Sequence, residues 1–194
     1  MYRLILDTAT KTLYAALLND NNIISENYIE GRNDHAKNVV SIIDIMLKEN
    51  GIDINMVDEI YVGVGPGSYT GVRMAVTVGK MIATNTNAKL YKFSSLFMLS
   101  SGYDGKVLPY IDARRGNSFN ALYDNSNIVL EEALRNTEDT INQNTLFKPI
   151  SEDMIKVDPL KVIKNSIIEN NPHSLIPNYL RETEAERNLD NKES

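Results

Sequence analysis

The chain has 194 residues and a formal charge of −6, from 20 basic and 26 acidic side chains. It contains no cysteine, which excludes a disulfide framework, a thiolate metal site and a cysteine nucleophile. His35 and His173 lie 138 positions apart, which excludes a local His-x-x-x-His metal pair. The pI near 5.0 argues against binding of nucleic acid by this chain alone, because such affinity comes mostly from Lys and Arg.

Length allows one large domain or two small ones. Residues 1–7 lack the basic-then-apolar layout of a signal peptide. No apolar run approaches the roughly 18 residues that a membrane helix needs. We therefore expect a cytoplasmic protein without a membrane segment.

The first 100 residues predict a mixed sheet covered by helices. Three strands joined by short turns are expected at residues 2–7, 12–18 and 23–29. Helical spacing of apolar residues then predicts a helix over 34–50, which Gly51 ends. The elements expected next are a strand at 59–63, a helix from the glycine-rich turn to about 84, a strand at 90–93 and a short helix at 94–100.

The second half partly repeats the first at an offset of 105 residues. Asp7 aligns with Asp112, and the stretch from Ala16 overlies that from Ala121 with the Asn-rich turn in the same register. A duplicated β-meander explains this; the alternative is that any two hairpins share an alternating pattern.

The last third is less clearly patterned. Residues 136–144 are polar and weakly patterned. Pro159 starts a helix whose apolar stripe is expected to run to Asn170. Residues 182–194 are mostly polar and are expected to form a solvated terminal segment. We expect two lobes, an N-terminal lobe over 1–104 and a smaller, degenerate C-terminal lobe over 105–194.

A glycine-rich loop, residues 65–71, lies between a predicted strand and a predicted helix. Such a loop can present backbone N–H groups to an anion. It is neither a P-loop, because no Lys follows the last glycine, nor the dinucleotide fingerprint. The alternative is a tight turn in which Ser68 or Thr70 caps the helix.

Polar residues after the first strand could add to an anion site. Asp7, Thr8 and Thr10 could hold a metal–phosphate group, or Asp7 could bond the backbone of its own turn. Arg114 and Arg115 could bind phosphate or a carboxylate, although a lone pair of arginines is more often surface charge.

Both long predicted helices carry more apolar residues than one core needs. In the second, small residues recur every fourth position from Gly71 to Ala83, which permits close approach of a neighbour. The helices could pack only on each other and the sheet, or one side could be covered by another protein. We favour a combination of the two.

Four segments together resemble the TsaB (YeaZ) family: ILDTAT at 5–10, GPGSYTGVR at 65–73, IDARRG at 111–116 and PNYLRETEAER at 177–187. The resemblance covers nearly the whole chain. It implies an α/β fold of two lobes with the actin-like ATPase (ASKHA, RNase H-like) architecture and a reduced second lobe. It also implies a role in making N6-threonylcarbamoyladenosine on tRNA, next to the anticodon.

The resemblance further implies how such a protein acts. The chain is expected to be a non-catalytic scaffold without catalytic or metal-binding residues, pairing with the catalytic paralogue TsaD and the ATPase TsaE. It would meet tRNA only through the complex, and could form a homodimer when alone. No tightly bound cofactor is expected, but the resemblance allows ATP or ADP with magnesium at the joint interface.

The expected interface residues lie on the two apolar helices: His35, Val39, Val40, Ile42, Ile43, Met46, Gly71, Met74, Ala75 and Val78. A rival hypothesis is an actin-like ATP-dependent phosphotransferase. For either nucleotide role the expected binding residues are Asp7, Thr8, Thr10, Gly65, Gly67 and Ser68.

Overall fold

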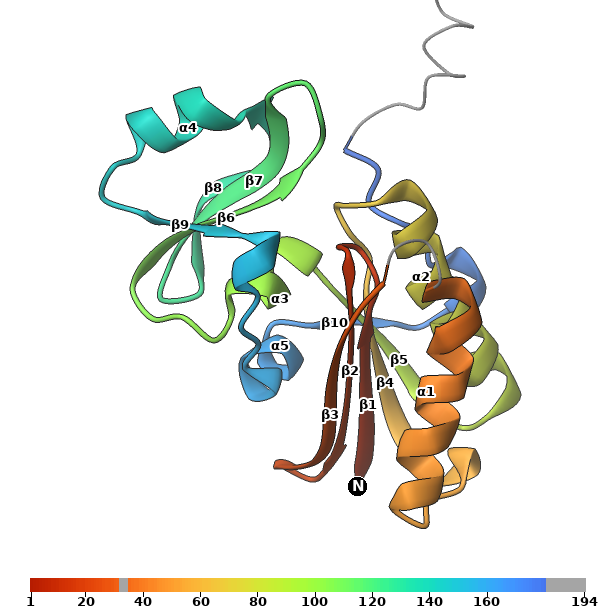
Figure 1. Ribbon diagram of the computed structural model, residues 1–194. Helices are drawn as coiled ribbons and strands as arrows, with labels where there is room; N and C mark the ends of the chain where they lie inside the picture. The colour runs from red at the N-terminus through yellow and green to blue at the C-terminus, as the bar shows by residue number, and fades with distance from the viewer. Residues whose placement is uncertain (32–34, 181–194) are drawn as a thin grey trace, which may run out of the picture.

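The computed structural model describes residues 1–31 and 35–180, without the side chains of residues 35–38. Two sheets lie side by side, with helices on both faces of the first (Figure 1). The first sheet has the strand order β10-β5-β4-β1-β2-β3. Its strands are β1 (Tyr2–Asp7), β2 (Thr12–Asn19), β3 (Asn22–Glu30), β4 (Val57–Gly63), β5 (Lys89–Phe93) and β10 (Ile167–Glu169).

The second sheet has the order β8-β7-β6-β9. Its strands are β6 (Lys106–Asp112), β7 (Asn117–Asp124), β8 (Asn127–Asn136) and β9 (Lys148–Ser151). The helices are α1 (His35–Glu49), α2 (Tyr69–Asn85), α3 (Ser95–Ser100), α4 (Thr137–Gln143) and α5 (Pro159–Lys164), with 3-10 turns η1 (Ile54–Met56), η2 (Glu152–Met154) and η3 (Pro172–Ser174). Among the described residues, no helix is both long and apolar enough to cross a membrane.

Successive residues of the central strands β1 and β2 supply two different cores, because side chains alternate across a strand. Leu4 and Leu6 pack against α1 and α2 on one face. Ile5 points to the other face, in a cluster that includes Met98 of α3 and Val162 of α5. Strands buried on both faces explain why β1 and β2 are almost continuously apolar.

The second sheet shares α3 with the first. Leu96, Phe97 and Leu99 of α3 belong to the core of the second sheet, whereas Met98 belongs to the first. This short helix is buried along its whole length and joins the two lobes.

The internal repeat is confirmed by the topology. In both sheets, three antiparallel strands form a meander, and a parallel strand joins its first member. The turns after the first strands also match: Ala9 N–H donates to Asp7 Oδ1 at 2.8 Å, and Arg114 N–H donates to Asp112 Oδ1 at 2.9 Å. A mixed α/β fold with two sheets is therefore confirmed.

Three sequence predictions are corrected or extended. The helix expected to reach Asn170 ends at Lys164, and residues 167–169 instead form β10, which pairs with β5. β10 belongs to the first sheet, although its residues follow the lobe boundary that was expected at residue 104. The position of that boundary stays a prediction. Residues 137–143, weakly patterned in sequence, form α4, which the Asn136 side chain caps. The expected solvated end, residues 182–194, and Asp34, the expected first residue of the helix over 34–50, lie outside the described residues.

Candidate functional site

The residues predicted to bind nucleotide do come together, where the β1–β2 turn meets the loop before α2. Ser68 N–H donates to the carbonyl of Ala9 at 2.7 Å. Thr8 Oγ1 donates to the carbonyl of Gly71 at 2.6 Å and accepts from Ala75 N–H at 3.1 Å. The two loops are therefore bonded directly to each other.

The glycines of this loop allow that close approach. A Cβ on Gly71 would lie 2.0 Å from the carbonyl oxygen of Thr8, and one on Gly67 would lie 2.4 Å from that of Ala9. The loop is therefore packed at these two glycines against the backbone of the β1–β2 turn. Ser68 caps α2, accepting from Gly71 N–H at 3.3 Å, as the tight-turn alternative predicted.

Asp7 is sealed inside this junction. Its side chain is fully buried, accepts a hydrogen bond from Ser95 Oγ and bonds the N–H of Ala9. Burial raises the pKa of Asp7 to about 6, although both hydrogen bonds act in the opposite direction. Gly63 is required beside it, because a Cβ there would overlap the carboxylate.

Asp7, Thr8 and Thr10 are buried in this conformation, and their predicted role in holding a metal–phosphate group stays a prediction. Thr8 and Thr10 are buried, and Thr10 Oγ1 donates to the carbonyl of Thr12 at 3.0 Å. The alternative, an Asp bonded to its own turn, is what the structure shows.

The C-terminal segment 171–180, here called the strap, crosses the same loop. Asn178 N–H donates to the carbonyl of Val64 at 2.7 Å, and a Cβ on Gly65 would lie 3.4 Å from the carbonyl oxygen of Asn178. Leu175 is buried in the first core, while Leu180 packs against the second. The strap thus covers the glycine loop and ties the two lobes together.

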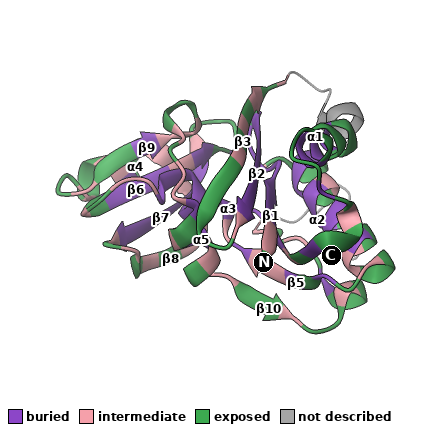
Figure 2. Ribbon diagram, turned by 90° about the horizontal axis from the view of Figure 1, so that it is seen from below, coloured by how far each residue is buried: buried purple, intermediate pink, exposed green. Residues whose placement is uncertain are grey.

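The predicted interface helices bury most of the residues named for that role. Figure 2 shows α1 and α2 with buried positions towards the sheet and exposed positions outside. Seven of the ten residues belong to the buried side of these helices: Val39, Ile42, Ile43, Met46, Gly71, Ala75 and Val78. These side chains pack within the chain, against the sheet and each other, and their predicted contact with a partner stays a prediction. The side chain of His35 lies outside the described residues.

Exposed apolar side chains remain on the outer side of both helices. Val40 and Ile45 of α1 are each 52% exposed, and Met81 of α2 is 49% exposed. Of these, only Val40 is among the ten predicted interface residues. Ile45 follows Val40 by five positions, so it lies off the main stripe, which was the available signal that it faces outwards.

A groove of about 330 Å³ lies between α1 and α2. Its lining combines apolar and polar side chains: Val39, Thr70, Arg73, Met74, Thr77 and Val78. Met74, predicted as an interface residue, is partly exposed here. No residue of α2 carries a negative charge.

Comparison with known proteins agrees with this fold. A family model described as "TsaD: tRNA N6-adenosine threonylcarbamoyltransferase" matches residues 22–165. A Bacillus subtilis protein named "tRNA threonylcarbamoyladenosine biosynthesis protein TsaB" is 28% identical over 221 residues, covering 94% of this chain and 95% of the relative. The chain belongs to the TsaB (YeaZ) family.

Other TsaB and YeaZ proteins extend this result. The Escherichia coli TsaB is 29% identical over 125 residues, which are 62% of this chain and 54% of that protein. The solved structure of YeaZ from Pseudomonas aeruginosa has a TM-score of 0.72 at 22% identity, covering 92% of this chain and 99% of the other. In this TsaB-family chain, the GPGSYTGVR segment forms the closed junction of the β1–β2 turn with α2.

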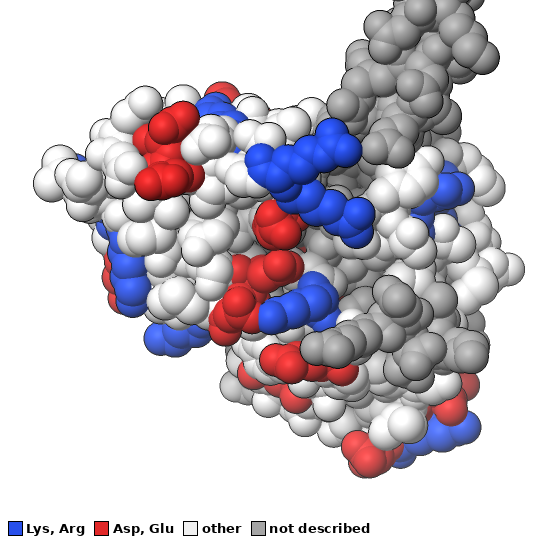
Figure 3. Space-filling model, turned by 45° about the horizontal axis from the view of Figure 1, so that its top comes forward, with Lys and Arg blue, Asp and Glu red and all other residues white. Residues whose placement is uncertain are grey.

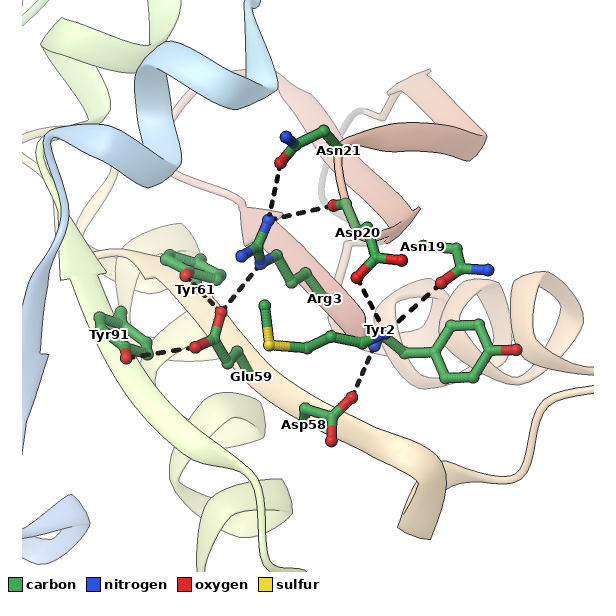
Figure 4. A network of polar contacts seen from close by, with 10 residues as sticks. Tyr2, Arg3, Asn19, Asp20, Asn21, Asp58, Glu59, Tyr61 and Tyr91 are labelled. Atoms are coloured by element: carbon green, nitrogen blue, oxygen red, sulfur yellow. Dashed lines mark hydrogen bonds and ion pairs between the residues drawn. The ribbon is translucent and has the colours of Figure 1, made fainter.

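A second polar network lies at the amino-terminal edge of the first sheet (Figure 4). Arg3 Nε donates to Glu59 Oε2 at 3.0 Å, and Tyr61 and Tyr91 donate to the same carboxylate at 2.7 and 3.3 Å. Burial, together with this carboxylate, raises the pKa of both tyrosines. The Glu59 carboxylate already accepts three hydrogen bonds, so this network holds β1, β4 and β5 together and Glu59 is not a candidate ligand-binding group.

Proposed function

We propose that this TsaB-family chain takes part in forming N6-threonylcarbamoyladenosine on tRNA as a non-catalytic subunit that binds the catalytic paralogue TsaD. Family membership and the names of the relatives support the pathway. The observation that carries the binding role is the outer side of α1 and α2, which has half-exposed apolar side chains and a groove between the two helices.

The outer side of these helices has the character of an interface. Val40, Ile45 and Met81 each leave about half of an apolar side chain exposed to water, which is unfavourable without a partner. Arg73 and Thr77 add polar groups at the groove, so a partner helix could pack there with both apolar and polar contacts. Met74 can adapt its shape to such a partner.

The sealed junction supports a role through binding rather than through chemistry. An actin-like phosphotransferase would need an acidic group in reach of nucleotide and magnesium, whereas Asp7 is fully buried and bonded to Ser95 and Ala9. Nucleotide turnover by the isolated chain above background would support that rival function.

We propose TsaE as a further partner, and ATP or ADP with magnesium only at the joint interface. We also propose that the chain associates with itself through the same surface and acts in the cytoplasm on tRNA.

The double variant Val40→Asp/Ile45→Asp tests the binding role. Two desolvated charges in an apolar interface should weaken capture of TsaD and tRNA threonylcarbamoylation by at least about tenfold. The thermal midpoint should change little, because both side chains are half exposed in the free chain. Pull-down with TsaD, liquid chromatography of tRNA nucleosides and thermal denaturation measure the three quantities.

Ile128→Asp/Val129→Asp is the matched control, since these side chains of β8 are 56% and 54% exposed. It should leave TsaD capture unchanged. If the α1 variant retained full capture and modification, binding through this surface would be disproved. Charges at Val39 or Ala75 are unsuitable for the test, because both residues lie in the core.

A further inference from the structure

The hairpin between β6 and β7 ends in an unusual backbone. Arg114, Arg115 and Gly116 have φ values of 67°, 57° and 76°. Asn117 N–H donates to the carbonyl of Arg114 at 3.1 Å, so Arg115 and Gly116 are the central residues of a tight hairpin turn. Residues 113–116 are called the arginine tip below.

Arginine is unfavourable in this left-handed backbone conformation. Left-handed φ favours Gly, Asn and Asp, because a longer side chain meets the following carbonyl. The other described residues with positive φ follow this rule or carry a small hydroxyl: Asp20, Asn125, Ser126, Gly51, Gly65 and Gly105. Strain of this kind is characteristic of functional sites.

The arginine tip presents several donors that no described residue uses. Arg114 and Arg115 are exposed, and neither guanidinium has a hydrogen-bond or ion-pair partner within residues 1–31 and 35–180. In the same part of the chain, the N–H groups of Arg115 and Gly116 also have no acceptor. Two guanidinium groups on consecutive residues, together with two backbone N–H groups, supply the kind of donors that phosphate oxygens accept.

Carboxylates near the arginine tip would repel additional phosphates, so they limit the number of phosphates that could bind there. Asp112 accepts from Arg114 N–H, and Asp153 pairs with Lys11 Nζ. Glu138 and Asp139 follow Thr137, whose N–H donates to the carbonyl of Gly116 at 2.9 Å. Figure 3 shows Lys and Arg side chains gathered between the lobes, with Asp and Glu directly beside them.

We propose that the arginine tip binds phosphate groups of an RNA backbone, at a contact of about two phosphates. A protruding, exposed tip suits an extended polyanion, whereas a small ligand would need an enclosing cavity. The choice of RNA rests on the proposed function in tRNA modification. The contact would supplement the binding of tRNA by the catalytic partner.

The test compares the full chain with Arg114→Gly/Arg115→Asn, titrated at 20 to 150 mM salt with an unmodified tRNA transcript. The variant should lose most binding at low salt, and its slope of log K against log salt should shrink by about 1.5, as expected for two phosphates. Its thermal midpoint should rise by about 2–4 °C, because Gly-Asn-Gly relieves the turn. A merely structural role of the arginines would lower that midpoint instead.

Lys89→Gln/Lys164→Gln removes the same charge from exposed residues elsewhere and should bind tRNA like the wild type. Three results would overturn the proposal: no wild-type binding at low salt, equal binding by the arginine variant, or equal wild-type affinity for polyglutamate or inorganic phosphate. TsaD capture is measured separately. The arginine variant should retain it, so loss of capture by the α1 variant bears only on the proposed function.

Discussion

Asp7 illustrates how one residue can look chemical in the sequence and be structural in the fold. An acid followed by two threonines at the end of a strand is compatible with a metal–phosphate ligand set or with a turn. The structure decides for the turn, because Ser95 and Ala9 occupy both carboxylate oxygens in a site without solvent. Sequence could not show this, since Ser95 lies 88 positions away.

Asp7→Asn is predicted to alter how stability depends on pH. The folded pKa of about 6 exceeds the ordinary value of 3.8, so the contribution of protonated Asp7 is fully present below about pH 4 and is lost as pH rises through 6. The isosteric amide has no such loss. Relative to wild type, the variant should therefore gain about 2 kcal/mol of unfolding free energy between pH 4 and pH 7.

Urea denaturation at a series of pH values measures this gain. Asp44→Asn, which changes an exposed carboxylate paired with Lys48, should shift stability by less than about 0.5 kcal/mol at each pH. Parallel pH curves for Asp7→Asn and wild type would contradict a raised pKa.

At the scale of elements, the sequence predicted helices and strands correctly where apolar residues recur at a regular spacing within the segment. Alternation and helical spacing predicted β1 to β5, α1 and α2 to within a few residues. The same reasoning failed after Lys164, because Ile167 and Ile168 continue a helical stripe but pair with β5 instead. Pairing with a strand about 75 positions earlier is a tertiary contact that no local window contains.

The junction of the loop with α2 depends on glycine at position 71. Gly71→Ala should lower the unfolding free energy by about 1–3 kcal/mol, despite the better helix propensity of Ala, because its Cβ would meet the carbonyl of Thr8. Thermal denaturation should show the loss as a lower midpoint. The exposed residue Thr77 of the same helix provides the comparison, since Thr77→Ala should stay within about 0.5 kcal/mol. An unchanged midpoint for Gly71→Ala would show that the junction opens easily.

At the scale of the whole molecule, the two lobes are joined by α3, the strap and one shared carboxylate. Glu132 of β8 accepts hydrogen bonds from Ser94, Tyr123 and Asn178, which belong to the cap of α3, to β7 and to the strap. Burial raises the pKa of Glu132, and the bonds from Ser94 and Tyr123 offset part of that rise. The lobes are thus connected through polar as well as apolar contacts.

Glu132→Ala should loosen this connection. Its three donors would lose their acceptor, which should cost about 1–3 kcal/mol of unfolding free energy and speed hydrogen exchange in residues 172–180. Glu131→Ala removes an exposed carboxylate from the neighbouring position and should change neither quantity measurably. Unaltered exchange in the strap of the Glu132 variant would mean that α3 and the apolar contacts alone hold the lobes.

The sequence by itself determined the fold class, the internal repeat and the family, because periodicity, turn residues and motif order are properties of the chain. Only the tertiary structure decided which apolar residues of α1 and α2 face the sheet and which remain outside. It also showed that the glycine loop is closed by the β1–β2 turn and covered by the strap. Burial and long-range hydrogen bonds depend on segments that meet only after folding. The same sequence motif is therefore compatible with a ligand site and with a packed turn, and only the folded chain distinguishes them.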